Sequence, residues 1–261
     1  MKLEVITREP KERRFVTPLL FIHGTGHAAW CWEENFLPYF ANRGFSSHAI
    51  SLRGHGTSDG SEKLKWTRIA DFVEDVQNVA SGFDREPVVI GHSLGGLVAT
   101  KYLEQYEAPA GVLVAPIPTE GMLRSGLKIQ MRNPLLIAKV ALKQDYAVMF
   151  GTPQLAKKFL FSVDADEAWV EKYSSRFGKE ALLAALEMIY NLPKPDKIKV
   201  PILIVGAENG AVIGGRLIAK SAQTLNADYR VFPNIAHDMM LEKGWRDVAE
   251  HIAGWLKRKV S

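Results

Sequence analysis

The sequence predicts an α/β fold in which a mostly parallel central sheet carries helices on both faces. Short, nearly continuous apolar runs alternate with segments whose apolar residues recur at helical spacing, which is typical of parallel strands buried on both sides. The chain has 261 residues, of which 47% are hydrophobic and 24% are charged. These proportions are those of an ordinary globular protein with a large core.

The expected strands are short and end in glycine, proline or polar residues. A helix is expected over residues 69–80, and another over residues 248–256, because apolar residues recur there every three or four positions. The strands are expected at Leu19–Ile22, Ser46–Ser51, Pro87–Ile90, Gly111–Ala115, Pro201–Val205 and Asp228–Phe232.

The alternation of strands and helices is interrupted between residues 117 and 198. This stretch contains several prolines and helical patterns but no clear strand pattern. We therefore expect a helical cap (or lid) at residues 117–198. The core would then be formed by residues 1–116 together with residues 199–261.

A serine lies at the point where one expected strand gives way to a helix. Residues 88–96 read Val-Val-Ile-Gly-His-Ser-Leu-Gly-Gly, and the serine is Ser93. Small neighbours allow a strained strand-to-helix turn, which lifts the hydroxyl out of the sheet and directs a helix N-terminus toward developing negative charge. We interpret Ser93 as a nucleophile rather than as part of a structural glycine turn.

Four motifs in this order resemble those of the α/β-hydrolase fold family, and the resemblance extends from about residue 18 to residue 259. They are His-Gly-Thr-Gly at 23–26, Arg-Gly-His-Gly-x-Ser at 53–58, Gly-His-Ser-Leu-Gly-Gly at 91–96 and Ile-Ala-His-Asp at 235–238. Each motif follows an expected strand. The resemblance implies a serine hydrolase of the esterase or lipase kind, with a cap between residues 117 and 198.

The resemblance also implies two backbone groups of an oxyanion hole and a general base. The N–H groups of Thr25 and Leu94 occupy the positions that hold the oxyanion in this family, and one such donor contributes about 3 kcal/mol to acyl transfer. His237 follows the last expected strand and would accept the proton of Ser93, since neutral imidazole titrates near working pH. The order of Ser93 before His237 is the family order.

The third member of the triad is missing from its usual place. The family carries an acid after the penultimate strand, in a stretch such as Gly-x-Glu-x-Asp, and this chain has Gly210 at the acid position. Loss of the acid in a related triad lowers kcat by ~10⁴. Glu120, just past the strand at 111–115, is one possible substitute. Glu208 or Asn209 would serve if the loop were shifted, and otherwise the chain works as a dyad with reduced turnover or only binds ligands.

The sequence therefore predicts hydrolysis of a carboxylic ester through an acyl-enzyme on Ser93, with a small-molecule substrate that carries an apolar group. A thioesterase, a lactonase, a hydroxynitrile lyase or a degenerate hydrolase that only binds ligands would share the same site. Asp in place of Ser93 would be expected of a haloalkane dehalogenase or an epoxide hydrolase.

Composition and charge limit the partners. The formal net charge is +4, and the basic residues are spread along the chain, so nucleic acid is not an expected partner. We expect no cofactor, no metal site and no membrane-spanning segment, since no apolar run approaches the ~20 residues of a membrane helix. One cysteine, Cys31, and the absence of a signal-peptide pattern predict a cytoplasmic protein. The oligomeric state is not indicated.

Overall fold

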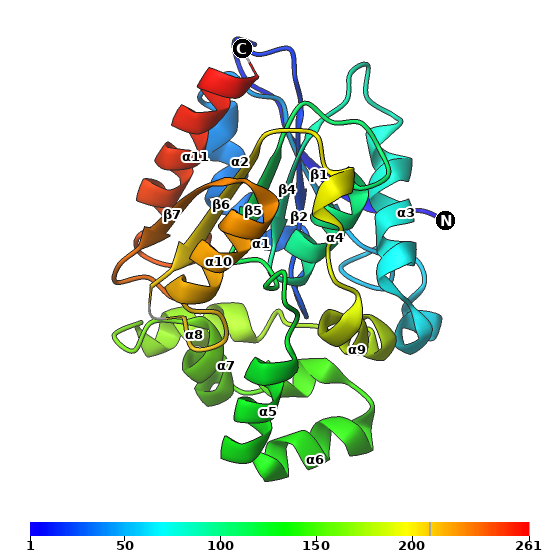
Figure 1. Ribbon diagram of the computed structural model, residues 1–261, viewed down its shortest axis with the longest axis vertical. Helices are drawn as coiled ribbons and strands as arrows, with labels where there is room; N and C mark the ends of the chain where they lie inside the picture. Colours follow the sequence, from blue (N-terminus) through cyan, green and yellow to red (C-terminus); the bar gives the residue numbers. More distant parts are fainter. Residues whose placement is uncertain (209, 261) are drawn as a thin grey trace.

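The computed structural model describes residues 1–208 and 210–260, which form a seven-stranded sheet flanked by helices (Figure 1). The strands lie in the order β1-β3-β2-β4-β5-β6-β7. β1 pairs with β3 in the antiparallel direction, and the other pairs are parallel. The predicted fold class is thus confirmed. The strands are β1 Glu4–Arg8, β2 Leu19–Ile22, β3 Ser47–Ser51, β4 Val88–His92, β5 Gly111–Val114, β6 Ile202–Ala207 and β7 Asp228–Phe232.

Six of these strands lie within two residues of their predicted ends, but β1 was not predicted. β1 is an edge strand with alternating half-buried and exposed side chains, and only Val5 and Ile6 among its residues are apolar. Such a short alternation gives little signal in the sequence. Its register, from Glu4 opposite Ser51 to Arg8 opposite Ser47, is fixed by pairing with a strand far away in the chain.

The two faces of the sheet pack against different helices. Phe21 and Ile90 pack in one core cluster, whereas Leu20 and Val89 pack in another, because successive side chains of a strand point to opposite faces. The first face is covered by α1 Trp30–Glu33, α2 Phe36–Ala41 and α11 Trp245–Lys259. The second face is covered by α3 Ile69–Ala80, α4 Leu94–Leu103 and α10 Gly215–Leu225. Two further 3-10 turns are η1 Ser61–Trp66 and η3 Pro195–Lys197.

Residues 117–198, here called the β5–β6 segment, contain helices and no strand, and all of them are described. Figure 1 shows these helices together at one end of the sheet. Thr152 and Asp166 cap two of them, since their side chains accept hydrogen bonds from the first turn. The helices are α5 Leu123–Arg132, α6 Pro134–Lys143, η2 Tyr146–Phe150, α7 Pro153–Leu160, α8 Glu167–Ser174 and α9 Leu182–Tyr190.

Backbone hydrogen bonds hold the β5–β6 segment against the carboxyl edge of the sheet. The Gly178 N–H donates to the carbonyl of Gly26 at 2.8 Å, and the Asp238 N–H donates to the carbonyl of Leu160 at 3.0 Å. Both contacts join the segment to loops that follow strands β2 and β7. In the described part of the chain, no helix is both long and apolar enough to span a membrane.

Candidate active site

Ser93 lies at the corner between β4 and α4. Its φ of 51° and ψ of −114° are rare for a residue other than glycine. The corner is held in place from the neighbouring strand, because the Ser93 N–H donates to the carbonyl of Val114 at 3.0 Å. The Gly96 N–H then donates to the Ser93 carbonyl at 2.9 Å. The surrounding structure therefore maintains a strained backbone that presents the hydroxyl at the carboxyl edge of the sheet.

Two glycines of this corner are required because backbone atoms of neighbouring segments approach them closely. A Cβ atom on Gly91 would lie 2.1 Å from the carbonyl oxygen of Gly95. A Cβ atom on Gly95 would lie 2.3 Å from the carbonyl oxygen of His23, at the end of β2. Larger residues would push α4 away from the sheet, so the Gly-x-Ser-x-Gly pattern follows from packing.

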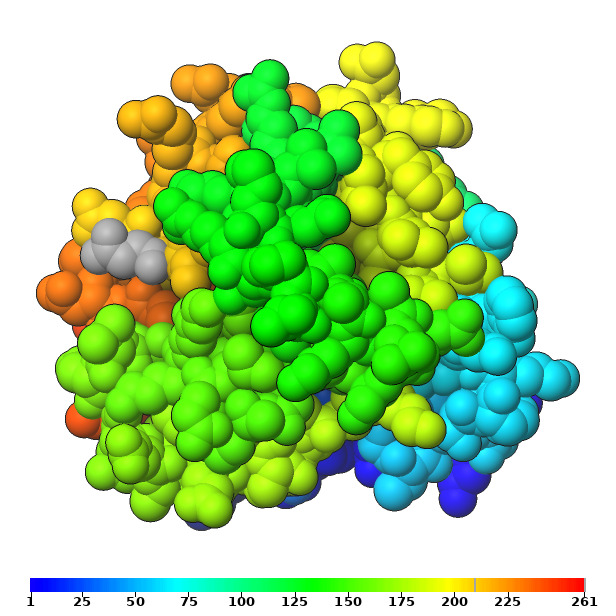
Figure 2. Space-filling model, turned by 90° about the horizontal axis from the view of Figure 1, so that it is seen from below, coloured from blue at the N-terminus to red at the C-terminus, as the bar shows by residue number. Residues whose placement is uncertain are grey.

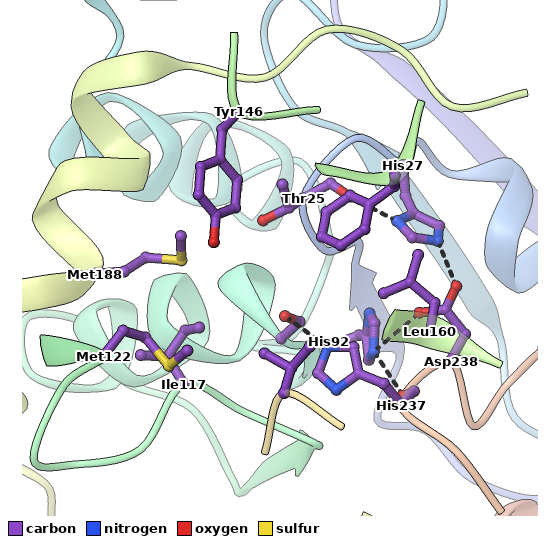
Figure 3. Close-up of a pocket in the computed structure, with 13 residues that line it drawn as sticks. Thr25, His27, His92, Ile117, Met122, Tyr146, Leu160, Met188, His237 and Asp238 are labelled. Carbon is purple, nitrogen blue, oxygen red and sulfur yellow. Dashed lines mark hydrogen bonds and ion pairs between the residues drawn. The ribbon is translucent and has the colours of Figure 1, made fainter. Parts of the chain in front are cut away.

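His237, in the loop between β7 and α11, meets Ser93 across this edge. Its Nε2 atom lies 3.0 Å from the Ser93 Oγ, and both side chains are buried (Figure 3). Burial, together with the nearby positive charge of His27, lowers the pKa of His237 to about 3. The imidazole is therefore neutral near pH 7, and its Nε2 accepts the hydrogen bond that the serine hydroxyl donates.

Thr25 and Leu94 lie close to this pair. Thr25 lines the same cavity as Ser93, and Leu94 is the first residue of α4, directly after the serine. Within the described residues, neither backbone N–H donates to another protein group. The Leu94 N–H at the N-terminus of α4 and the Thr25 N–H in the loop after β2 are suited to an anionic oxygen.

No carboxylate in the described chain reaches the other nitrogen of His237. Its Nδ1 atom is buried and has no hydrogen-bond partner among those residues. Gly210 lines a separate groove together with Glu208, which is exposed. Glu120 does not supply the acid, because it pairs with Lys220 on α10. Asn209, the remaining candidate substitute, lies outside the described residues.

The carboxylate beside His237 is bound to a different histidine. Asp238 is fully buried, and its Oδ2 accepts a hydrogen bond from Nε2 of His27 at 3.0 Å (Figure 3). The other ring nitrogen of His27 donates to the carbonyl of Thr25 at 2.8 Å. Burial disfavours a charged ring, but the charge and hydrogen bond of Asp238, the hydrogen bond to Thr25 and the charge of Glu180 together outweigh burial and raise the pKa of His27. The two residues therefore form a buried ion pair.

His92, His237 and Asp238 bring three potential ligand atoms within 4.8 Å of one another. Their surroundings favour a hydrogen-bond network over a metal site. Nε2 of His92 donates to the His237 carbonyl at 3.1 Å, and Nε2 of His237 contacts Ser93. Burial, together with the neighbouring His237, also lowers the pKa of His92 to about 3. His92 thus holds the loop of His237.

Glu180 is a site residue that no local pattern in the sequence indicates. It is buried, and its Oε2 accepts a hydrogen bond from the Gly26 N–H at 3.0 Å. Its other oxygen lies 3.4 Å from Nε2 of His55. Glu180 belongs to the β5–β6 segment, so this contact connects that segment to the loop of Thr25. The pairing joins positions more than a hundred residues apart, and no local pattern marks it.

The space in front of Ser93 is small. The cavity there measures about 20 Å³, room for roughly one water molecule. Met122, Tyr146 and Met188 of the β5–β6 segment line one side of it (Figure 3). The same three side chains also line an apolar groove of about 500 Å³ between α5, α6 and α9. The groove and the cavity therefore share these three residues in their linings.

The sheet order, the serine corner and the histidine after the last strand define an α/β-hydrolase. The family model described as "Alpha/beta hydrolase family" matches residues 19–251, and the chain belongs to this family.

Several known proteins resemble the whole chain. It is 24% identical over 254 residues to "Phospholipase YtpA" of Bacillus subtilis, which covers 91% of this chain and 94% of that protein. It is 24% identical to "Epoxide hydrolase 3" of Xenopus tropicalis, covering 92% of this chain and 71% of the relative. A thermophilic esterase from Thermogutta terrifontis has the same fold, with a TM-score of 0.77 and 17% identity over 99% of this chain and 94% of that chain.

Proposed function

We propose that the protein hydrolyses carboxylic esters through an acyl-enzyme on Ser93. The observation that carries this proposal is the 3.0 Å contact between Ser93 Oγ and Nε2 of His237 at the carboxyl edge of the sheet. A strained, buried serine beside a neutral imidazole is suited to nucleophilic attack on a carbonyl. The phospholipase and esterase among the similar proteins support this class of reaction.

In the first half of the reaction, Ser93 Oγ attacks the ester carbonyl carbon while its proton passes to Nε2 of His237. The carbonyl oxygen becomes an oxyanion and accepts hydrogen bonds from the N–H groups of Thr25 and Leu94. The tetrahedral intermediate then expels the alcohol, which takes the proton from Nε2. Water attacks the acyl-enzyme in the same way, and the acid and the free serine are released.

Turnover in this proposal is slow, because among the described residues the charged form of His237 has no carboxylate partner. Burial and His27 lower the pKa of His237 to about 3, so the imidazolium that forms during attack is unfavourable. Removing the acid from a related triad lowers kcat by ~10⁴. We therefore infer a Ser-His dyad with low kcat rather than a complete triad.

We further propose that residues 117–198 act as a cap and that the substrate carries an apolar group. The groove of about 500 Å³ is lined almost entirely by apolar side chains, and Met122, Tyr146 and Met188 are among them. Because these residues also close the cavity at Ser93, they must move apart for an ester to bind. An acyl chain in the groove would then have its carbonyl at Ser93.

The test is hydrolysis of p-nitrophenyl butyrate and p-nitrophenyl decanoate by the wild type, Ser93→Ala and Ser81→Ala. Ser81 is an exposed serine at the end of α3 and serves as the matched control. We expect Ser93→Ala to abolish turnover and Ser81→Ala to leave it unchanged. Equal turnover by all three proteins would refute the proposal. Turnover of thioesters or of lactones, without turnover of these esters, would instead identify the protein as a thioesterase or as a lactonase.

A further inference from the structure

Helix α5 carries an apolar row beside a basic row, and neither is covered. None of its ten residues, all described, is buried. Leu123, Leu127 and Met131 recur every four residues and so form one row along the helix. The basic residues Arg124, Lys128 and Arg132 form the adjacent row. In a helix that packs only on its own protein, an apolar row of this kind would face the core.

Helix α6 continues the same surface. Leu135 and Leu142 are 80% and 86% exposed, and Met131 at the end of α5 is 77% exposed. Five of the sixteen exposed large apolar side chains in the described chain lie in these two helices. Figure 2 shows this part of the chain, in green, standing out across the middle of the face seen from below. We call the exposed apolar and basic residues of α5 and α6 the α5–α6 surface.

The charge of the α5–α6 surface has one sign. Residues 121–144 include five basic residues and no acidic one: Arg124, Lys128, Arg132, Lys139 and Lys143. Among the residues that the structure describes, none of these five forms an ion pair. A partner that covers this surface must therefore be both apolar and anionic.

The α5–α6 surface also borders the route to the candidate nucleophile. Leu123 and Leu127 line the apolar groove, and Met122, Tyr146 and Met188 line it as well. Those three residues line the cavity at Ser93. An amphiphile on the α5–α6 surface would thus already contact part of the lining of the groove.

We propose that the α5–α6 surface docks on an anionic lipid bilayer. The exposed leucines and Met131 would enter the interface, while the basic row would lie at the level of the anionic head groups. Docking itself is independent of the chemistry at Ser93, but its purpose rests on the proposed function, because it would supply lipid esters to the groove.

The experiment is sedimentation with vesicles, using Ser93→Ala so that hydrolysis cannot alter the lipid. Vesicles are made of phosphatidylcholine alone or of phosphatidylcholine mixed with phosphatidylglycerol. We expect binding to the anionic vesicles, weakened by salt, and much weaker binding to the neutral ones. Replacing Arg124, Lys128 and Arg132 by glutamine should reduce the partition coefficient by about a hundredfold. Replacing Met131, Leu135 and Leu142 by serine should also reduce it.

The matched control replaces Lys257, Arg258 and Lys259 by glutamine. These residues end α11 at the opposite end of the molecule from α5 and α6 (Figure 1), and the change in net charge is the same. We expect this control to bind vesicles as the parent does. An equal loss in the control would mean that overall charge, not the α5–α6 surface, drives binding, and would overturn the proposal.

Two other outcomes would also overturn it. No binding to anionic vesicles, with hydrolysis of soluble butyrate ester intact, would reject docking and leave the proposed function standing. A concentration-dependent dimer that the three serine substitutions abolish, again without vesicle binding, would assign the surface to a second copy of the chain. Vesicle binding without any ester hydrolysis by the wild type would instead reject the proposed function and keep the docking surface.

Discussion

His27 and Asp238 form a buried ion pair beside the candidate dyad, with Nε2 of His27 3.0 Å from Oδ2 of Asp238. A catalytic triad usually places such a carboxylate on the histidine that serves as base. Here the carboxylate binds a neighbouring histidine, and the resulting cation contributes to the low pKa of His237. The pair therefore stabilises the loops of Thr25 and His237 rather than the charged form of the base.

Asp238→Asn should destabilise the fold by about 3 kcal/mol, because breaking a buried ion pair leaves one partner uncompensated. The measurement is the free energy of unfolding in urea. Glu12→Gln, which removes an exposed ion pair with Arg14, is the control and should change that free energy by less than about 1 kcal/mol. If the two substitutions have similar effects, the His27–Asp238 pair is not an important part of the fold.

The pH dependence of kcat/KM should lack the usual fall near neutral pH. Since the pKa of His237 is lowered to about 3, the imidazole stays neutral when the pH falls through 6.5, and the base form persists. Activity on a soluble ester should change less than about twofold between pH 7 and pH 5.5. An acid limb near pH 6.5 would contradict this account of His237.

Loss of folding stability at acidic pH limits the range over which kcat/KM stays constant. The unfolded chain protonates His92 and His237 near pH 6.5, whereas the folded chain does so only near pH 3. Between these values the unfolded state holds more protons, so each of these histidines lowers stability as the pH falls, by up to about 1.4 kcal/mol per pH unit. Circular dichroism at each pH distinguishes unfolding from protonation of the base.

Gly210→Asp should raise kcat, and Gly210→Ala should not. The aspartate restores an acid at the family position, and full recovery would correspond to ~10⁴ in kcat. Both substitutions place a Cβ 2.2 Å from the carbonyl oxygen of Ile213, so both require the same shift of the loop. The alanine variant therefore controls for the steric cost. Equal kcat values for the two variants would show that a carboxylate at this position does not reach His237.

Leu186→Trp should impair the hydrolysis of esters with long acyl chains more than the hydrolysis of esters with short ones. Leu186 lines the apolar groove and is partly exposed, so a larger ring fills the groove with little strain on the core. We expect KM for the decanoate ester to rise about tenfold, since a few methylene contacts lose roughly 1–3 kcal/mol, with a smaller change for the butyrate. Leu192→Trp is the control, because Leu192 is similarly exposed and does not line the groove. Identical effects on both esters would exclude the groove as the acyl site.

Local patterns in the sequence were sufficient to predict the parallel strands and the serine corner. Buried strands are continuous apolar runs, and the corner requires glycines at positions 91 and 95. The ion pair of His27 with Asp238 and the contact of Glu180 with Gly26 could not be predicted. They join residues 211 and 154 positions apart, and each forms only after the sheet has brought the loops together. The acid position was predicted from the family pattern, which this chain does not follow.

Covalent labelling of Ser93 tests the central claim most directly. The protein is incubated with an alkyl phosphonate that carries a good leaving group, and the intact mass and the modified peptide are determined. We predict one adduct per chain, on the peptide that contains Ser93, with no adduct in Ser93→Ala and much slower labelling in His237→Ala. An unmodified wild type that is folded, or an adduct at another residue, would contradict the assignment of Ser93 as the nucleophile.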